Sequence, residues 1–304
     1  MSLFIQTVYL AAGLSLGYIF LLYRSNPLRR LPGTTVTVAF TVGMLAVLPV
    51  VLLHRLLPLN TQPGPFSAFV TAGLVEEAVK FAVMAFTIWR LRFPDVAEPL
   101  DVAIYFGVLG VGFGVYEDFS YLFSGTYPVW SAGNAAAARH ALDALVLARS
   151  FPGHILFDGL AGFLVGTARF LPGWQARLPW LAGAFLLAVT LHGCFDLIAT
   201  AGGTIPLLTY LALLVGGFLA LRRAALAHSP FRAVIVRVRT GNAPWPYPRP
   251  PIDYLFADGF SWPGRPRSGM FQIFPLALSL LILYPLLVAA VYVVERAVLW
   301  GAGG

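Results

Sequence analysis

Nine ionisable side chains interrupt four otherwise apolar stretches in the first two thirds of the chain. They are Glu76, Glu77, Lys80, Glu117, Asp118, His154, Asp158, His192 and Asp196. Carboxylates activate water and transfer protons, and imidazoles do the same or bind metal ions. These residue types therefore indicate a hydrolytic or proton-transfer site, provided that the four stretches bring them together.

The first group consists of Glu76, Glu77 and Lys80. Residues four apart lie on the same face of an α-helix, so Glu76 is expected to form an ion pair with Lys80. Glu77 lies about 100° further around the helix. It is therefore expected to face a cavity, where its carboxylate is free for chemistry.

The two histidines share a second spacing. His154 precedes Asp158 by four residues, and His192 precedes Asp196 by four. A carboxylate one turn away holds an imidazole ring in one tautomer, as it does around many catalytic or metal-bound histidines. Each histidine is therefore expected to be oriented by the aspartate that follows it.

The elements that must position these residues are membrane helices. The 304-residue chain is 59% apolar and 11% charged, whereas a soluble domain is about one-quarter charged. A bilayer core about 30 Å thick is crossed by roughly 20 apolar helical residues. Eight stretches meet this need: Leu3–Tyr23, Thr34–Leu57, Phe66–Trp89, Asp101–Phe123, Ser150–Phe170, Trp180–Ala201, Thr204–Leu221 and Phe271–Val294. The predicted fold is an all-α polytopic membrane protein, a single membrane domain over residues 1–304 with about eight transmembrane helices.

Ionised groups inside such helices carry a large cost in free energy. An isolated charge at the bilayer centre costs about 2.5–3.5 kcal/mol. The acidic, basic and imidazole side chains must therefore face one another or a water-filled cavity rather than lipid. The sequence thus predicts a buried polar cluster, built from the helices within about residues 66–201.

The arginines are distributed unevenly between the two sides of the predicted spans. Fifteen fall on one side: Arg24, Arg29, Arg30, Arg90, Arg92, Arg169, Arg177, Arg222, Arg223, Arg232, Arg237, Arg239, Arg249, Arg265 and Arg267. Four fall on the other: Arg55, Arg139, Arg149 and Arg296. Basic residues concentrate on the cytoplasmic side, so both termini are expected to be extracytoplasmic and the polar cluster to lie in the outer half of the bilayer. Arginines at helix ends suit anionic lipid, so the net charge of +7 does not indicate nucleic-acid binding.

Two connections are longer than turns. In the first, Ser124–Arg149, the alanine-rich run Asn134–Ala148 is expected to form a helix on the membrane surface. The second, from about residue 222 to 270, is basic and contains the proline-rich run Pro244–Pro251. Because proline cannot sustain a helix, this run is expected to be extended on the cytoplasmic surface, before a last helix at about 271–294.

Four short motifs, in this order along the chain, resemble the PrsW family of intramembrane proteases, which is akin to the CAAX-processing and bacteriocin-processing membrane proteases. Glu76-Glu77-Ala78-Val79-Lys80 fits E-E-x-x-K, Phe113 to Asp118 resembles F-x-x-x-E followed by Asn or Asp, Pro152-Gly153-His154 opens the third motif, and His192 to Asp196 fits H-x-x-x-D. The resemblance covers about Phe66–Ala201. It implies an endopeptidase of a prokaryotic plasma membrane that cleaves membrane-anchored proteins such as anti-sigma factors.

Peptide hydrolysis needs an activated water, a group that polarises the carbonyl and a proton donor for the leaving amine. With this resemblance, Glu77 is the expected general base, Glu76 with Lys80 supplies electrostatic support, and Asp196 orients His192. The remaining candidates, Glu117, His154 and His192, bind either a metal or the polarised substrate.

The residue types are consistent with two chemistries. Zinc accepts two histidines and a carboxylate with an open position for water, so His154, His192 and Glu117 are candidate zinc ligands. No H-E-x-x-H motif is present, and the alternative is a metal-free site in which Glu77 activates water directly.

A proton- or ion-coupled transporter is the alternative function. Buried acidic residues and histidines also relay protons in such proteins. Transporters are often built from two similar halves, and this sequence has no second copy of Glu-Glu-x-x-Lys. Peptide hydrolysis is therefore favoured.

The arginine asymmetry predicts the outcome of reporter fusions. Alkaline phosphatase fused after Gly304 should be active because that end is expected outside, and the same enzyme inserted in Arg222–Met270 should be inactive. The activity of the two fusions, normalised to their amounts, is the measurement. The reverse pattern would invert the predicted orientation.

Overall fold

The computed structural model describes residues 3–28, 31–57, 62–87, 96–149, 153–201 and 204–229. Every regular element in these ranges is a helix, as predicted. The proline-rich run 244–251 and the expected last span at 271–294 lie outside the described residues.

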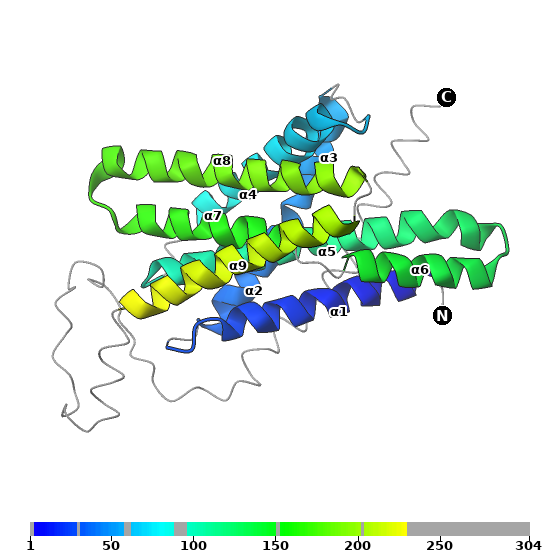
Figure 1. Cartoon of the computed structure of the whole chain (residues 1–304), viewed down its shortest axis with the longest axis horizontal. Coiled ribbons are helices and arrows are strands. Elements are labelled where there is room, and N and C mark those ends of the chain that lie inside the picture. Colours follow the sequence, from blue (N-terminus) through cyan, green and yellow to red (C-terminus); the bar gives the residue numbers. More distant parts are fainter. Residues whose placement is uncertain are drawn as a thin grey trace.

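The described helices follow one another with short connections (Figure 1). In chain order they are α1 (Leu3–Arg24), α2 (Gly33–Leu45), α3 (Val47–Leu56), the π-helical segment η1 (Ser67–Leu74), α4 (Val75–Ala85), α5 (Pro99–Ser131), α6 (Ala135–Arg149), α7 (Gly153–Phe170), α8 (Gly173–Thr200) and α9 (Thr204–His228).

Helix α5 is the centre of the bundle. Its residues from Leu100 to Val115 are all buried, which is the pattern of a helix packed on every side. Helices α1, α2, α6 and α7 pack directly against it, and α8 and α9 pack in turn against α7. Helix α5 therefore supports α7 directly and α8 through α7.

Glycines allow the closest of these helix contacts. A Cβ at Gly112 of α5 would overlap the backbone carbonyl of Phe40 in α2. A Cβ at Gly162 of α7 would lie 2.8 Å from the Cα of Ala103 in α5. Small residues at such positions let membrane helices approach until their backbones touch.

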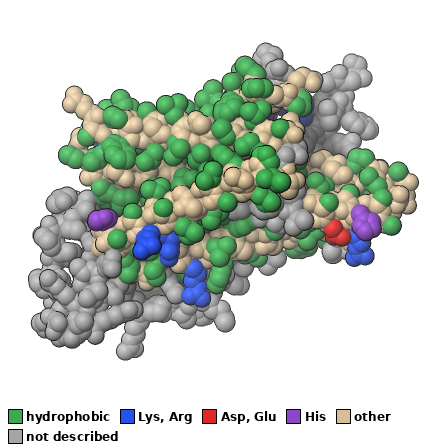
Figure 2. Space-filling view, viewed as in Figure 1, with side chains coloured by type: hydrophobic (Ala, Val, Ile, Leu, Met, Phe, Trp, Pro, Cys, Tyr) green, Lys and Arg blue, Asp and Glu red, His purple; other side chains and the backbone are tan. Residues whose placement is uncertain are grey.

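The outer surface is that of a protein surrounded by lipid. Figure 2 shows one face covered by hydrophobic side chains, with charged side chains gathered near the end of α9 and over α6. Ile205, Leu213 and Phe20 are large apolar residues with 79%, 69% and 54% of their surface exposed. Burial within the fold does not explain these residues, whereas a hydrocarbon environment does.

Five helical segments among the described residues are long and apolar enough to cross a membrane: Leu3–Arg24, Gly33–Leu56, Pro99–Ser131, Gly173–Thr200 and Thr204–His228. The spans expected at 66–89 and 150–170 correspond to η1 with α4 and to α7, which are not among the five. These helices indicate that the chain is an integral membrane protein. The total of eight transmembrane spans stays a prediction.

Several helices continue beyond the expected spans. Helix α5 extends to Ser131, so residues 124–131 are helical rather than part of a connection. Helix α9 extends to His228 and includes Arg222 and Arg223, which were assigned to the segment after the span. The alanine-rich run does form a helix, α6, where the Asn134 side chain accepts a hydrogen bond from the amide of Ala137 (3.0 Å).

The basic helix ends lie together at one end of the bundle. In Figure 1 the carboxyl ends of α1 and α9 and the connection between α7 and α8 are all on the left. These positions carry Arg24, Arg222, Arg169 and Arg177. The arrangement agrees with the alternation of sides used to count the arginines.

Candidate active site

Four elements bring the predicted polar residues together. Helix α4 contributes Glu76, Glu77 and Lys80, α5 contributes Glu117, α7 contributes His154 and Asp158, and α8 contributes His192 and Asp196. Contacts of 4 Å or less link each of these side chains to another of the group. These side chains therefore lie together in one cluster, as the sequence predicted.

Lys80 is the hub of the cluster. Its side chain is fully buried, and its ammonium lies 2.5 Å from Glu77 Oε1 and 3.1 Å from Asp158 Oδ2. It also donates to Nδ1 of His154 at 3.2 Å and lies 5.1 Å from the centre of the Phe113 ring. Two carboxylates, one imidazole and one aromatic face thus replace the water that the ammonium would have in solution.

The expected pairing of Glu76 with Lys80 is wrong. The salt bridge is made by Glu77, three residues before the lysine, and by Asp158 of α7. Both i,i+3 and i,i+4 spacings bring helical side chains together, so the spacing alone allowed either glutamate. Glu76 instead lines a cavity, and its buried Oε2 has no hydrogen-bond partner.

His192 is oriented by Glu77 from another helix. Its Nδ1 donates to Glu77 Oε1 at 2.8 Å, while its Nε2 lies 3.4 Å from Asp196 Oδ2 and 3.9 Å from Glu76 Oε2. The expected neighbour Asp196 is therefore close to the ring, but it faces the same nitrogen that points into the cavity. The Phe157 ring stacks on the His192 ring at 5.3 Å and 21°.

His154 is held between a cation and a carboxylate. Because an ammonium has no acceptor, Nδ1 of His154 must accept from Lys80, and Nε2 carries the ring proton and donates to Glu117 Oε2 at 2.8 Å. Asp158 was expected to orient this ring. Instead it binds Lys80, so that the lysine stands between the aspartate and the imidazole.

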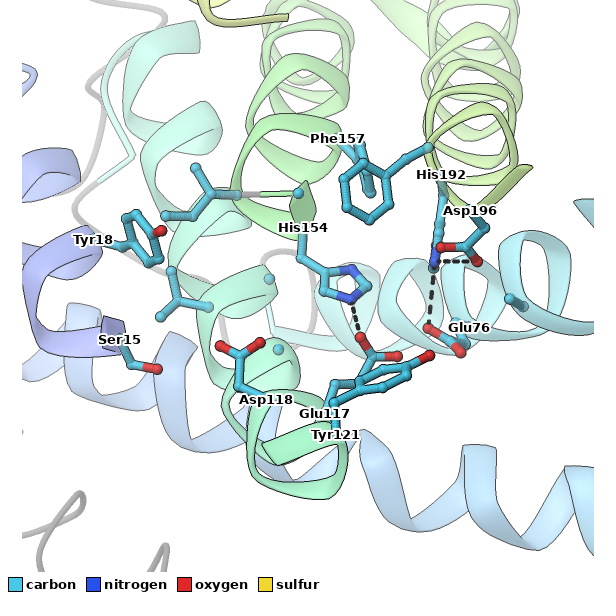
Figure 3. Close-up of a pocket in the computed structure, with 17 residues that line it drawn as sticks. Ser15, Tyr18, Glu76, Glu117, Asp118, Tyr121, His154, Phe157, His192 and Asp196 are labelled. Carbon is cyan, nitrogen blue, oxygen red and sulfur yellow. Dashed lines mark hydrogen bonds and ion pairs between the residues drawn. The ribbon is translucent and has the colours of Figure 1, made fainter. Parts of the chain in front are cut away.

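The cluster opens into a cavity of about 90 Å³. Figure 3 shows Glu76, Glu117, His154, His192 and Asp196 pointing into it from four helices. Since one water needs about 10–15 Å³ by this measure, several waters fit beside these side chains. The cavity therefore offers room for water next to a carboxylate oxygen, Oε2 of Glu76, that makes no hydrogen bond.

Sequence reasoning missed three supporting residues. Phe157 stacks on His192, and Phe113 contacts His154 edge-on at 5.3 Å as well as Lys80. His54 donates from Nε2 to the carbonyl of Thr71 at 2.9 Å within η1. Phe113 was recognised from the sequence as a motif residue and as an apolar neighbour of Glu117, but not as a contact of Lys80 or His154. Nothing in the local sequence of Phe157 or His54 distinguishes them from core side chains.

A zinc site was predicted from His154, His192 and Glu117. Among the described residues, Glu76, His154 and His192 offer ligand atoms that all lie within 4.8 Å of one another, so two of the three candidates belong to this group. His192 suits a metal, since donation from Nδ1 to Glu77 leaves Nε2 facing the cavity. His154 does not, because accepting from Lys80 at Nδ1 places the proton on Nε2, the nitrogen that would bind. As hydrogen-bonded here, the three residues do not fit a metal as a set.

Buried glutamates, histidines and a lysine around a water-sized cavity, all on membrane helices, define a polar centre of the kind used for hydrolysis within a bilayer. A family model described as the PrsW family intramembrane metalloprotease matches residues 31–221. Because this match covers well over half of the chain, the chain belongs to that family.

Individual relatives agree with this assignment. "Protease PrsW" of Clostridioides difficile (strain 630) is 29% identical over 164 residues, covering 52% of this chain and 64% of the relative. The proteins of the same name from Bacillus subtilis (strain 168) and Geobacillus kaustophilus (strain HTA426) are 27% and 29% identical, and the matches cover 68% and 63% of those relatives. The matches thus span roughly two thirds of each relative. No solved structure matches the chain.

The Lys80 network predicts a strong effect on stability. Lys80→Met leaves Glu77 and Asp158 buried without their cation, which should cost about 3–5 kcal/mol and lower the midpoint of thermal unfolding in detergent. The triple variant that adds Glu77→Gln and Asp158→Asn removes both charges and should recover much of this loss. A Lys80→Met protein that unfolds at the wild-type temperature would show that the ion pairs are not needed.

Proposed function

We propose that this protein is an intramembrane endopeptidase that hydrolyses a peptide bond of a membrane-anchored protein, such as an anti-sigma factor. The observation that carries the proposal is Glu76, a buried carboxylate that lines a cavity large enough for water and whose Oε2 makes no hydrogen bond. Family membership and the relatives named as proteases support it.

Glu76 replaces Glu77 as the proposed general base. Glu77 is fully buried and does not line the cavity. Its Oε1 is engaged by Lys80 and His192, and its Oε2, which makes no hydrogen bond, is not exposed to the cavity where a water would bind. Glu76 lines the cavity, and its free oxygen can take a proton from water and pass it to the leaving amine. Glu77 then acts as a positioning residue that holds His192 and Lys80.

His192 is the proposed donor to the carbonyl oxygen of the scissile bond. Both of its ring nitrogens face carboxylates, an arrangement that suits a ring donating at both positions. When Nε2 carries a proton it points into the cavity beside Glu76, where the negative charge on the oxygen would develop. Asp196 stabilises that proton from the cavity side.

Glu117 and His154 complete the site from the opposite wall. The hydrogen bond from Nε2 of His154 fixes one oxygen of Glu117, while Lys80 fixes the ring of His154 from behind. The second oxygen of Glu117 can then accept a hydrogen bond from the attacking water and orient it towards the carbonyl carbon.

The location of cleavage follows from the expected orientation. With both termini outside, His154 lies at the outer end of α7 and contacts Glu117, so the scissile bond is proposed to lie in or near the outer half of the bilayer. Lipid and the membrane-anchored substrate are the partners that this location requires.

Exchanging Glu76 for glutamine tests the assignment of the base. Glu76→Gln keeps the volume and removes the basicity, so cleavage of a co-expressed single-span substrate should fall by about 10²–10⁴-fold. The thermal unfolding midpoint should change little, because the affected oxygen has no hydrogen-bond partner to lose. The rate, by appearance of the cleaved fragment, and the unfolding curve are measured on the same preparation.

Glu77→Gln is the matched comparison. It too should slow cleavage, but with a lower unfolding midpoint, because Lys80 loses a carboxylate. Wild-type rates in Glu76→Gln would remove Glu76 from the mechanism. Solute uptake into liposomes without cleavage of any peptide would favour the transporter instead.

The metal content of the purified protein distinguishes zinc-dependent hydrolysis from a metal-free mechanism in which a glutamate activates water. Because the contact of Lys80 with His154 opposes ligation by that ring, cleavage is expected to persist in protein shown by elemental analysis to be free of zinc, and o-phenanthroline should leave the rate unchanged. Loss of activity with the chelator and recovery with added zinc would contradict this expectation. Loss of bound zinc in His154→Ala would identify His154 as a ligand.

A further inference from the structure

The catalytic cavity has a second polar region that the proposed mechanism does not use. It is lined by Asp118 of α5 and by Ser15 and Tyr18 of α1. In Figure 3 these three side chains lie on one side of the cavity, while His192, Asp196 and Glu76 lie on the other. Asp118 follows Glu117 directly, so the second region begins next to the catalytic carboxylate.

The charge of the cavity wall is one-sided. Four carboxylic acids line it, namely Glu76, Glu117, Asp118 and Asp196, and none of its described lining residues is a lysine or an arginine. The cation of the cluster, Lys80, lies behind the wall and is fully buried. A substrate side chain that enters this cavity therefore meets carboxyl groups at both ends.

The wall beside Asp118 offers acceptors. Ser15 is 2% exposed and donates its hydroxyl proton to the carbonyl of Ala11 at 3.0 Å, so that its oxygen is left to accept hydrogen bonds. Asp118 is 8% exposed, and an ionised carboxylate only accepts. A group with several N–H donors and a positive charge matches both residues, whereas an acidic or purely apolar side chain matches neither.

We propose that Asp118, with Ser15 and Tyr18 of α1, forms a subsite that selects substrates carrying a lysine or arginine next to the scissile bond. This inference rests on the proposed peptidase function and names a substrate class for the same cavity. Helix α1 precedes the residues matched by the family model, so Ser15 and Tyr18 lie outside the match while Asp118 lies inside it.

The subsite also explains how a charged side chain can enter a site within the membrane. A lone lysine in a membrane span is costly, and its long side chain extends towards the nearest polar environment. Asp118, a buried carboxylate beside the catalytic residues, provides that environment only when the substrate is bound with its lysine or arginine next to the scissile bond. Recognition of the cation and alignment of the adjacent peptide bond are thereby coupled.

The test uses the full chain in liposomes with a set of single-span peptides of identical sequence. Each peptide carries one lysine, glutamine or glutamate, moved residue by residue through the segment expected in the outer half of the bilayer. The kcat/KM for each peptide is measured by mass spectrometry of the products, with Glu76→Gln protein as the blank. At the best position, wild-type protein should prefer lysine over glutamine by about tenfold or more.

The variants assign this preference to the subsite. Asp118→Asn should lower kcat/KM for the lysine peptide and reduce the preference to about twofold or less, and Asp118→Lys should favour the glutamate peptide. Ser15→Ala, which removes one acceptor, should reduce the preference by a smaller factor. Asp143→Asn, on the exposed face of α6, is the matched control and should keep the wild-type ratio.

The outcomes distinguish this inference from the proposed function. Equal kcat/KM for lysine and glutamine peptides in wild-type protein would overturn the subsite and leave the peptidase standing. If Asp118→Asn lowered kcat/KM by the same factor for the lysine and the glutamine peptide, the subsite would also be overturned. Asp118 would then contribute to the chemical step rather than to the choice of substrate. Absence of any cleavage above the Glu76→Gln blank would overturn both.

Discussion

The site depends on keeping one ammonium group charged in a place that water does not reach. Lys80 is fully buried in a bundle whose exterior suits lipid, so its charge is tolerable only beside opposite charge. Glu77 of α4 and Asp158 of α7 supply that charge at 2.5 and 3.1 Å. The relative position of these two helices is thereby fixed, and with it the distance between the glutamates and the histidines.

The same ammonium determines the roles of the neighbouring side chains. It binds Glu77, whereas the adjacent Glu76 lines the cavity, and the proposed base is chosen on this difference. By donating to His154 it sets the tautomer of that ring, which then donates to Glu117. The proposed roles of base, orienting carboxylate and proton donor therefore depend on contacts to a residue that does not itself line the cavity.

Much of this arrangement could be predicted from the sequence. Polar residues that interrupt apolar helices have to meet, because each is costly alone, and the cluster contains all the predicted members. What could not be predicted was which partner each would choose. Helical spacing allows Glu76 or Glu77 to reach Lys80, and the choice depends on Asp158 and His192, whose positions follow from the packing of α7 and α8 against neighbouring helices.

The ends of the helices were predicted less well than their existence. A hydropathy pattern marks where a segment is apolar, whereas a helix ends where its backbone groups find other partners. Helix α5 therefore continues past Phe123 to Ser131 and packs against α6, which begins at a cap formed by Asn134. The π-helical turn of η1 is likewise invisible in composition, although its carbonyl at Thr71 binds His54.

The division of the cavity between two groups of helices has a consequence for specificity. The residues proposed for chemistry lie on α4, α5, α7 and α8, within the part of the chain that the family model matches, while Ser15 and Tyr18 lie on α1 outside it. If α1 forms the proposed subsite, changes in it alter which side chain is accepted without disturbing the contacts of Lys80. Because α1 packs mainly against α5, which also carries Glu117 and Asp118, such changes remain close enough to the catalytic carboxylate to position a substrate against it.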